Sequence, residues 1–186
     1  ITTRLVGSEM CIRDSLNATP KRIYDMPLLI FSSRLEQLMK PENISKRKLS
    51  IETHVDRASI TTYLQGSCLP RYEALARIAD YFEVSADYLL GLEEENIYCY
   101  HTVCEIEEIP DLFICRLKEL MREKGFSQGK LAEKIKMQQA SISKWIRKRA
   151  MPETFALMDL ATKAFDCKVD YLIGREINSN IKDISG

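Results

Sequence analysis

The chain repeats itself at a distance of 82 residues, and this repeat limits its possible folds more than any other feature. The best-matched stretches are Ser45–Tyr63 (SKRKLSIETHVDRASITTY) and Ser127–Trp145 (SQGKLAEKIKMQQASISKW). When residues 31–79 are aligned with residues 113–161, 15 of 49 pairs are identical. Each copy has enough apolar positions to close a small core, so the repeat predicts two separate domains and not a solenoid.

Apolar residues recur at helical spacing in both copies, and the residues between them predict five helices in each copy. Ser45 and Ser127 are expected to cap the second helices, and Asp56 the third helix of the first copy. In the first copy, helices are expected from Pro27 to before Pro41, over 45–53, over 57–64, from Pro70, and over 86–90 behind a Ser85 cap and up to Gly91. In the second copy, they are expected from Pro110, from Ser127, over 139–147, from Pro152, and over 169–173 up to Gly174.

The apolar residues of the two matched stretches are expected to face the core. They are Leu49, Val55, Ile60 and Tyr63 in the first copy, and Leu131, Ile135, Met137, Ile142 and Trp145 in the second. Beyond residue 79 the offset becomes 83, because Phe82 matches Phe165 and residues 87–89 match residues 170–172. The fourth helix of the second copy, or its end, is therefore expected to hold one extra residue.

Both copies resemble the helix-turn-helix domain of the Xre/Cro phage-repressor family. The shared features are the Ser cap, the Leu of the second helix, Ala-Ser-Ile at the start of the third, the following Pro and the closing Asp-Tyr-Leu. The resemblance covers residues 28–91 and 111–174, which are joined by an acidic linker over 92–110 and followed by a tail over 175–186. It implies an all-α fold of two tandem five-helix lambda-repressor-like DNA-binding domains.

The charge distribution supports such a partner, although Lys/Arg and Asp/Glu balance at 27 each. Residues 116–149 hold eleven Lys/Arg and three Glu, a net charge of +8. Residues 78–115 hold ten Asp/Glu and no Lys or Arg. Residues 34–71 have a net charge of +3. Two basic blocks around an acidic one form a pattern that the overall charge conceals.

The resemblance also implies which residues would contact DNA, with the third helix of each copy in the major groove. Gln can pair with adenine, and Lys or Arg with guanine. The base-contacting candidates are Gln139, Ala140, Ser141 and Lys144 in the second copy, and Arg57, Ala58, Ser59 and Thr62 in the first. The phosphate-contacting candidates are Gln128, Arg147, Lys148 and Arg149 in the second copy, and Lys46 in the first.

These residues imply a sequence-specific transcriptional regulator that is expected to repress by blocking promoter access. The two domains would read unlike half-sites roughly 34–36 Å apart. The alternative is a protein-interaction or dimerisation module in which one or both domains no longer bind DNA. Double-stranded DNA is the expected partner and a homodimer is left open. No cofactor and no small-molecule substrate are expected.

Two positions depart from the family pattern. Where its members commonly place an Arg in the first helix and a Glu in the third, the chain has Met39 with Leu64 and Met121 with Ile146. We expect an apolar contact in place of the ion pair. At the end of the third helix, Lys148 stands where Gly is usual, and it is expected to need a positive φ or a differently made turn.

The linker alternates over residues 97–103, which is typical of a short strand that needs a partner. Its Cys99, His101 and Cys104, with Cys115, could supply four zinc ligands. Their spacing is not a familiar ligand pattern, so ordinary half-buried cysteines are preferred and no metal is expected. The sequence shows no Gly-rich phosphate loop and no paired nucleophile and base, so no enzyme is expected.

The six cysteines form no disulfide framework, which favours a reduced cytoplasmic setting. No apolar run approaches 18 residues, so no transmembrane helix is expected. Leu5–Ser15 (LVGSEMCIRDS) resembles a translated sequencing-adapter string. Residues 1–27 are therefore expected to be artefactual or disordered, and either the authentic chain begins near Met26 or its true N-terminus is missing.

Overall fold

The structure, a computed structural model, describes residues 25–96 and 100–177. The first unit consists of α2 (Asp25–Met39), α3 (Lys46–Thr53), α4 (Arg57–Leu64), α5 (Tyr72–Tyr81) and α6 (Ala86–Leu90). Between the units lie strand β1 (Tyr100–Thr102) and the 3-10 helix η2 (Ile106–Glu108). The second unit consists of α7 (Ile109–Glu123), α8 (Gln128–Lys134), α9 (Gln139–Lys148), α10 (Thr154–Asp159), the π-helical η3 (Leu160–Phe165) and α11 (Val169–Leu172), and strand β2 (Arg175–Ile177) follows it. The all-α prediction is confirmed, apart from this two-stranded sheet.

The helices α3, α4 and α8 each begin directly after the polar residue that the sequence predicts as their cap. The side chain of Ser45 accepts a hydrogen bond from Lys48 N, and that of Ser127 accepts one from Lys130 N. Asp56 accepts two, and it starts α4 at the predicted residue. Each of these oxygens satisfies an amide that has no partner within its own helix.

The prolines do not open helices at the predicted positions. Pro27 is the third residue of α2, and Pro110 is the second residue of α7. Pro70 and Pro152 precede the N-cap residues of their helices, so α5 and α10 begin two residues later than predicted. Both prolines are buried, and the carbonyl of Pro70 accepts a hydrogen bond from Thr154 of the other unit.

The extra residue of the second copy is accommodated by a π-helix. The fourth helix of the first unit, α5, is α-helical throughout, whereas its counterpart is α10 continued by η3. A π-helical turn holds one more residue than an α-helical turn without changing the direction of the helix. As a result, Phe165 is buried although one residue has been added before it.

The core is contiguous across both units and includes nearly all of the predicted residues. Met137 is the exception, since 37% of it is exposed, whereas its counterpart Val55 is buried. The larger Ile135 is buried at the position that Thr53 occupies in the first unit. The prediction that Met137 faces the core is therefore wrong.

The strand predicted in the linker is present in part. Residues 100–102 form β1, while residues 97–99 lie outside the described residues. β1 pairs antiparallel with β2, with Tyr100 opposite Ile177 and Thr102 opposite Arg175. The partner edge that the linker strand needs is thus the start of the segment expected to be a tail. Among the described helices, none is long and apolar enough to cross a membrane.

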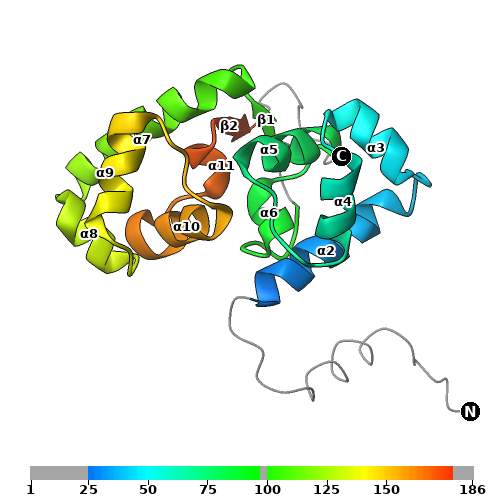
Figure 1. Cartoon of the computed structure of the whole chain (residues 1–186), viewed down its shortest axis with the longest axis horizontal. Helices are drawn as coiled ribbons and strands as arrows, with labels where there is room; N and C mark the ends of the chain where they lie inside the picture. The colour runs from blue at the N-terminus through cyan, green and yellow to red at the C-terminus, as the bar shows by residue number, and fades with distance from the viewer. Residues whose placement is uncertain (1–24, 97–99, 178–186) are drawn as a thin grey trace, which may run out of the picture.

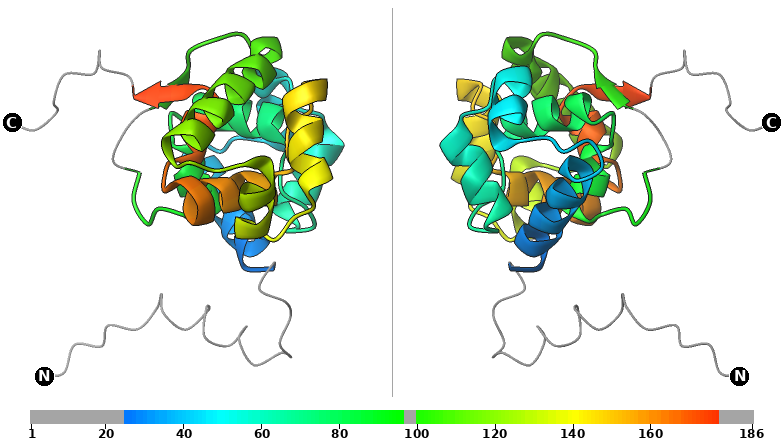
Figure 2. Two further views of the ribbon diagram at one scale, coloured as in Figure 1. Left: turned by 90° about the vertical axis from the view of Figure 1, so that its left-hand side faces the viewer. Right: turned by 90° about the vertical axis from the view of Figure 1, so that its right-hand side faces the viewer.

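The two units lie side by side along the long axis of the molecule (Figure 1). α5, α6, α10 and α11 meet in the middle, while α3–α4 and α8–α9 lie at opposite ends. Both views of Figure 2 place α4 and α9 toward the same side of the molecule.

The fifth helices of the two units cap each other. The carboxylate of Asp170 in α11 accepts hydrogen bonds from Ala86 N at 3.0 Å and Asp87 N at 3.2 Å. The carboxylate of Asp87 in α6 accepts from Val169 N and Asp170 N, both at 3.1 Å. Equivalent residues of the repeat therefore make equivalent contacts, which gives the junction an approximate twofold symmetry.

Candidate nucleic-acid interface

The α8–α9 pair of the second unit forms a compact helix-turn-helix. Its turn depends on Lys136, whose φ of 55° lets Met137 N reach back to Ala132 O at 2.8 Å. His54 has a φ of 53° at the equivalent position of the first unit. A left-handed residue at this point satisfies helix C-terminal carbonyls and redirects the chain. Neither residue is a Gly or Asn, so this feature could not be recognised from residue type.

One face of α9 is buried and the other faces solvent. Ile142 and Trp145 pack into the core. Of the predicted base-contacting residues, Gln139, Ala140 and Lys144 are exposed and Ser141 is half-buried. A helix held in this way by one face presents the other to a partner.

The N-terminal ends of α8 and α9 converge. A Cβ at Gly129 would lie 3.8 Å from Gln139 Oε1, so the Gln139 side chain lies against the first turn of α8. The predicted phosphate-contacting residue Gln128 is half-buried in that same turn. The structure thus brings one predicted phosphate contact, Gln128, and one predicted base contact, Gln139, to the same place.

The C-terminal end of α9 is basic, and the helix extends one residue beyond the predicted range. Lys148 is the last helical residue, and the positive φ of 52° falls on Arg149, so the helix ends in a differently made turn, the second of the two expected possibilities. α4 ends at Leu64, two repeat positions earlier, followed by Gly66 with a φ of 65°. Arg147 and Lys148 are exposed, whereas Arg149 is ion-paired with Asp111 at the start of α7.

The first unit presents a smaller polar face. Arg57 and Lys46 are exposed, and Ser59 and Thr62 are half-buried. The Thr62 hydroxyl donates to the Ser59 carbonyl at 2.8 Å, so it already has a partner within α4. The capping carboxylate of Asp56 lies at the end of α4 that would approach DNA, and its negative charge disfavours a phosphate there.

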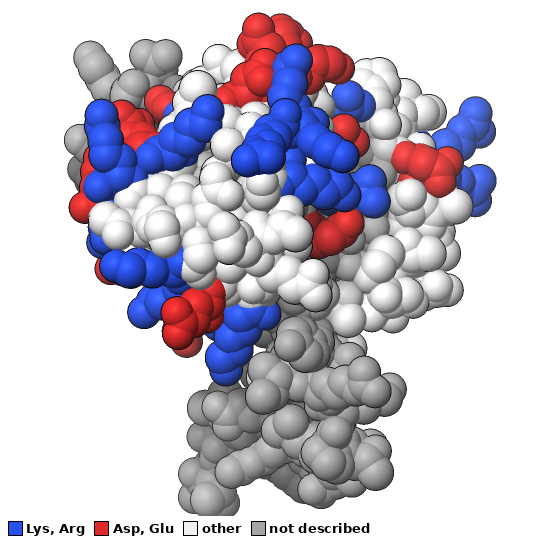
Figure 3. All heavy atoms as spheres, turned by 60° about the vertical axis from the view of Figure 1, so that its left-hand side comes forward, with Lys and Arg blue, Asp and Glu red and all other residues white. Residues whose placement is uncertain are grey.

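Figure 3 views the molecule with the α8–α9 end turned forward. Lys and Arg side chains gather above and below an uncharged area on this face, and Asp and Glu are fewer. An uncharged surface bordered by cations can approach a polyanion without repulsion.

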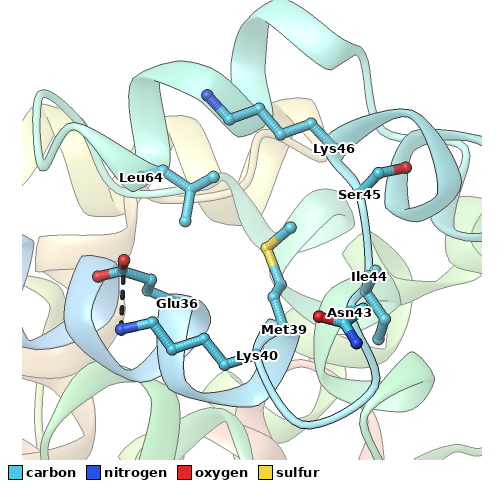
Figure 4. A pocket seen from close by; sticks show the side chains of 8 residues that line it. All are labelled: Glu36, Met39, Lys40, Asn43, Ile44, Ser45, Lys46 and Leu64. Carbon is cyan, nitrogen blue, oxygen red and sulfur yellow. Dashed lines mark ion pairs between the residues drawn. The ribbon is translucent and has the colours of Figure 1, made fainter.

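An open hollow of about 570 Å³ lies beside the helix-turn-helix of the first unit, between α2, α3 and α4 (Figure 4). Met39 and Leu64 both line it, and they point toward each other from α2 and α4. This is the pair that replaces the ion pair of the family. In the second unit, Met121 is buried and Ile146 packs against the core.

The described residues among the four considered as zinc ligands do not form a metal site. Cys99 lies outside the described residues, His101 and Cys115 are exposed, and Cys104 is half-buried. Burial raises the pKa of the Cys104 thiol, which opposes the thiolate form that binds zinc. Within residues 25–96 and 100–177, no group of three or more His, Cys, Asp and Glu side chains could hold a metal ion.

Comparison with known families assigns both units. The helix-turn-helix domain family matches residues 30–89, and a second helix-turn-helix family matches residues 117–172. Both units are helix-turn-helix domains. These domains contain α3–α4 and α8–α9, so the recognised segments are those that build the two faces described above, and the Xre/Cro resemblance is confirmed.

Two relatives carry the same kind of domain. The chain is 33% identical over 64 residues to the HTH-type transcriptional activator BcrR of Enterococcus faecalis. The aligned region covers 34% of the chain and 31% of the relative. The chain is 30% identical over 70 residues to the uncharacterized HTH-type transcriptional regulator YqaE of Bacillus subtilis (strain 168). Here the aligned region covers 37% of the chain and 60% of the relative. The chain therefore spans less than two thirds of either. No solved structure matches it significantly.

Proposed function

We propose that the chain is a sequence-specific DNA-binding transcriptional regulator. The observation that carries the proposal is the outer face of α9, which exposes Gln139 and Lys144 on a helix anchored by the buried Ile142 and Trp145. In a helix-turn-helix, the second helix of the pair lies in the major groove and contacts bases with its N-terminal residues. Both relatives are named as transcriptional regulators.

The exposed residues suit this chemistry. Gln139 can donate to and accept from adenine, and Lys144 can donate to guanine O6 and N7. Arg147 and Lys148 are exposed at the end of α9 and are suited to phosphates. Arg149 contributes less, because Asp111 already pairs with it.

The tandem arrangement supports two contacts on one DNA molecule. α4 and α9 lie at opposite ends of the long axis and toward the same side. Half-sites one helical turn apart, roughly 34–36 Å, present successive major grooves on one side of the duplex. Since Arg57 and Thr62 differ from Gln139 and Lys144, the half-sites would differ in sequence.

We propose repression, through occupation of a promoter, as the regulatory outcome. One relative is named an activator, so the direction needs its own measurement. A reporter fused to a promoter that carries the selected operator would be repressed when the chain is expressed, and increased transcription would overturn repression without affecting the DNA-binding proposal.

The test is selection of bound duplexes from a random pool with the full chain, followed by binding of the selected operator to variants. Gln139→Ala combined with Lys144→Ala should weaken binding by at least about 30-fold, since each good base contact contributes roughly 1–3 kcal/mol and two are removed. Lys118→Ala is the charge-matched control, because Lys118 is exposed on α7 and outside the α8–α9 face.

Each outcome has a meaning. Unchanged affinity in the double variant would refute DNA reading by the second unit. A selected operator with one half-site would mean that the first unit does not read DNA, which favours the alternative role of that unit in protein interaction. Failure to enrich any duplex would overturn the proposed function.

A further inference from the structure

Arg175 connects parts of the chain that are far apart in sequence. It is the first residue of β2, lies outside both matched helix-turn-helix segments and is 1% exposed. Its Nε donates to Asp80 Oδ1 in α5 of the first unit at 3.0 Å, and one terminal nitrogen donates to Asp170 in α11 of the second unit. The other terminal nitrogen donates to Val84 O at 2.9 Å and to Tyr100 O at 3.1 Å.

These contacts leave little freedom to the guanidinium. All three nitrogens are occupied, and the partners come from both units and from the segment between them. The guanidinium is planar and its donors point in fixed directions, so satisfying all of them requires one relative position of the partners. A buried Arg is tolerated only when it is paired in this way.

Arg175 also supplies a positive charge next to the buried carboxylates of the junction. Asp87 and Asp170 lie at the centre of the reciprocal caps, and both are buried. Two carboxylates at one buried junction repel each other unless a cation is present. Arg175 is that cation for Asp170.

Two further ion pairs cross the junction, and they are less able to hold one geometry. Arg71 and Glu153 are 3.6 Å apart, with side chains 76% and 75% exposed. Lys168 and Glu93 pair at a partly exposed position. Solvent screens such pairs, and their long side chains remain mobile.

We propose that Arg175 is a positioning residue that fixes the two helix-turn-helix domains relative to each other, and thereby determines which half-site spacing the protein accepts. This inference rests on the proposed DNA-binding function. By holding α5 and α11 together, Arg175 fixes the separation of α4 and α9. The segment that follows the second domain thus acts in recognition without touching DNA.

The experiment measures affinity for the selected operator and for versions in which the half-sites are moved apart or together by one or two base pairs. The parent protein should lose about tenfold or more at the wrong spacings, because rigidly linked domains cannot engage both sites at once. Arg175→Met should lose less than about threefold across the series, and should bind an isolated half-site as the parent does.

Arg34→Met is the matched control. Arg34 stacks on Tyr88 at 4.3 Å and donates to the carbonyls of Tyr88 and Glu93, all within or next to the first unit. It should keep the spacing dependence of the parent. A spacing profile of Arg175→Met that equals that of the parent would overturn the proposal.

A second variant and a second readout keep the test decisive. Asp80→Asn removes a charge only from the first-unit side of the bridge, and it should give an intermediate spacing profile if Arg175→Met does not fold. Spin labels at positions 48 and 134, which are exposed on α3 and α8, report the distance between the domains without DNA. Both variants should broaden that distance distribution. A distribution as narrow as that of the parent overturns the inference about Arg175. Because this distance is measured without DNA, the inference can fail or hold independently of the proposed DNA-binding function.

Discussion

Identical residues of the repeat make identical contacts. Arg34 and Arg116, on the first helices of the two units, each lie 4.3 Å above the ring of the tyrosine in the fifth helix, Tyr88 or Tyr171. Each also donates to the carbonyl of that tyrosine. An Arg over an aromatic ring combines apolar packing with a cation–π attraction. The two arginines therefore tie the ends of each domain together.

The Met residues that follow them on the same helices can be tested by a double-mutant cycle. Met121→Arg should destabilise the second domain by about 3–5 kcal/mol, because it leaves an unpaired charge at a buried position. Met121→Arg with Ile146→Glu should recover part of the loss by forming the ion pair that is usual in the family. Thermal unfolding of the four proteins measures the coupling.

The single variant Ile146→Glu is the necessary control, since a Glu at this half-buried position has a cost of its own. Strictly additive losses in the double variant would show that residues 121 and 146 do not interact.

At the scale of elements, the π-helix accommodates the one residue that the second unit has in addition to the first. α10 and η3 together correspond to α5, and Lys163 is exposed within the π-helical segment. Removing Lys163 restores the spacing of the first unit, in which Phe82 follows Ala79 by three positions. Phe165 would then follow Ala161 in the same way.

We predict that deletion of Lys163 leaves the second domain folded, with η3 converted to α-helix and the unfolding temperature lowered by only a few degrees. Circular dichroism and a thermal melt provide the measurement. Deletion of Arg77 is the control, because α5 has no extra residue to lose. That deletion turns the remainder of α5 by about 100° and moves Ile78 and Ala79 out of the core, so the first domain should unfold. Equal damage from both deletions would contradict this account.

Helix boundaries were predictable where a local interaction sets them. Asp56 caps its own α4, and Ser45 and Ser127 cap α3 and α8, so the cap and its partner amide lie within three residues. Prediction failed where the partner is distant. Pro70 does not open α5 because it lies at the junction, where its carbonyl accepts a hydrogen bond from Thr154. The sequence left the turn after α9 open between two forms, because Arg149 adopts the left-handed conformation that residue preferences assign to Gly or Asn.

At the scale of the whole molecule, the junction could not be derived from the sequence. The closing Asp-Tyr-Leu of each copy was recognised as a family feature, but nothing local indicates that each Asp caps the opposite helix, 82 to 84 positions away. Arg175 was assigned to a tail for the same reason. The outer face of α9 was easier to predict, because helical periodicity alone determines which residues oppose Ile142 and Trp145.

The junction makes stability depend on pH through Asp87. Burial, and then the nearby charge of Asp170, raise the pKa of Asp87 to about 7 in the folded chain. An Asp in an unfolded chain has a pKa of about 3.9. Between these values the folded state binds a proton that the unfolded state does not, so the contribution of Asp87 is fully present below about pH 4 and is lost as the pH rises through about 7.

We therefore predict that Asp87→Asn gains stability relative to the parent as the pH is raised from 4 to 7, by on the order of 1–4 kcal/mol. The Asn can accept only one of the two amide hydrogen bonds, but that loss is independent of pH. Urea unfolding of both proteins at each pH measures the difference, and subtraction removes the titration of the other carboxylates. Asp166→Asn, at an exposed site, should leave the difference flat. A flat difference for Asp87→Asn as well would mean that Asp87 is ionised in the folded junction throughout this range. Arg175 would then neutralise the carboxylates of both Asp87 and Asp170, and not only that of Asp170.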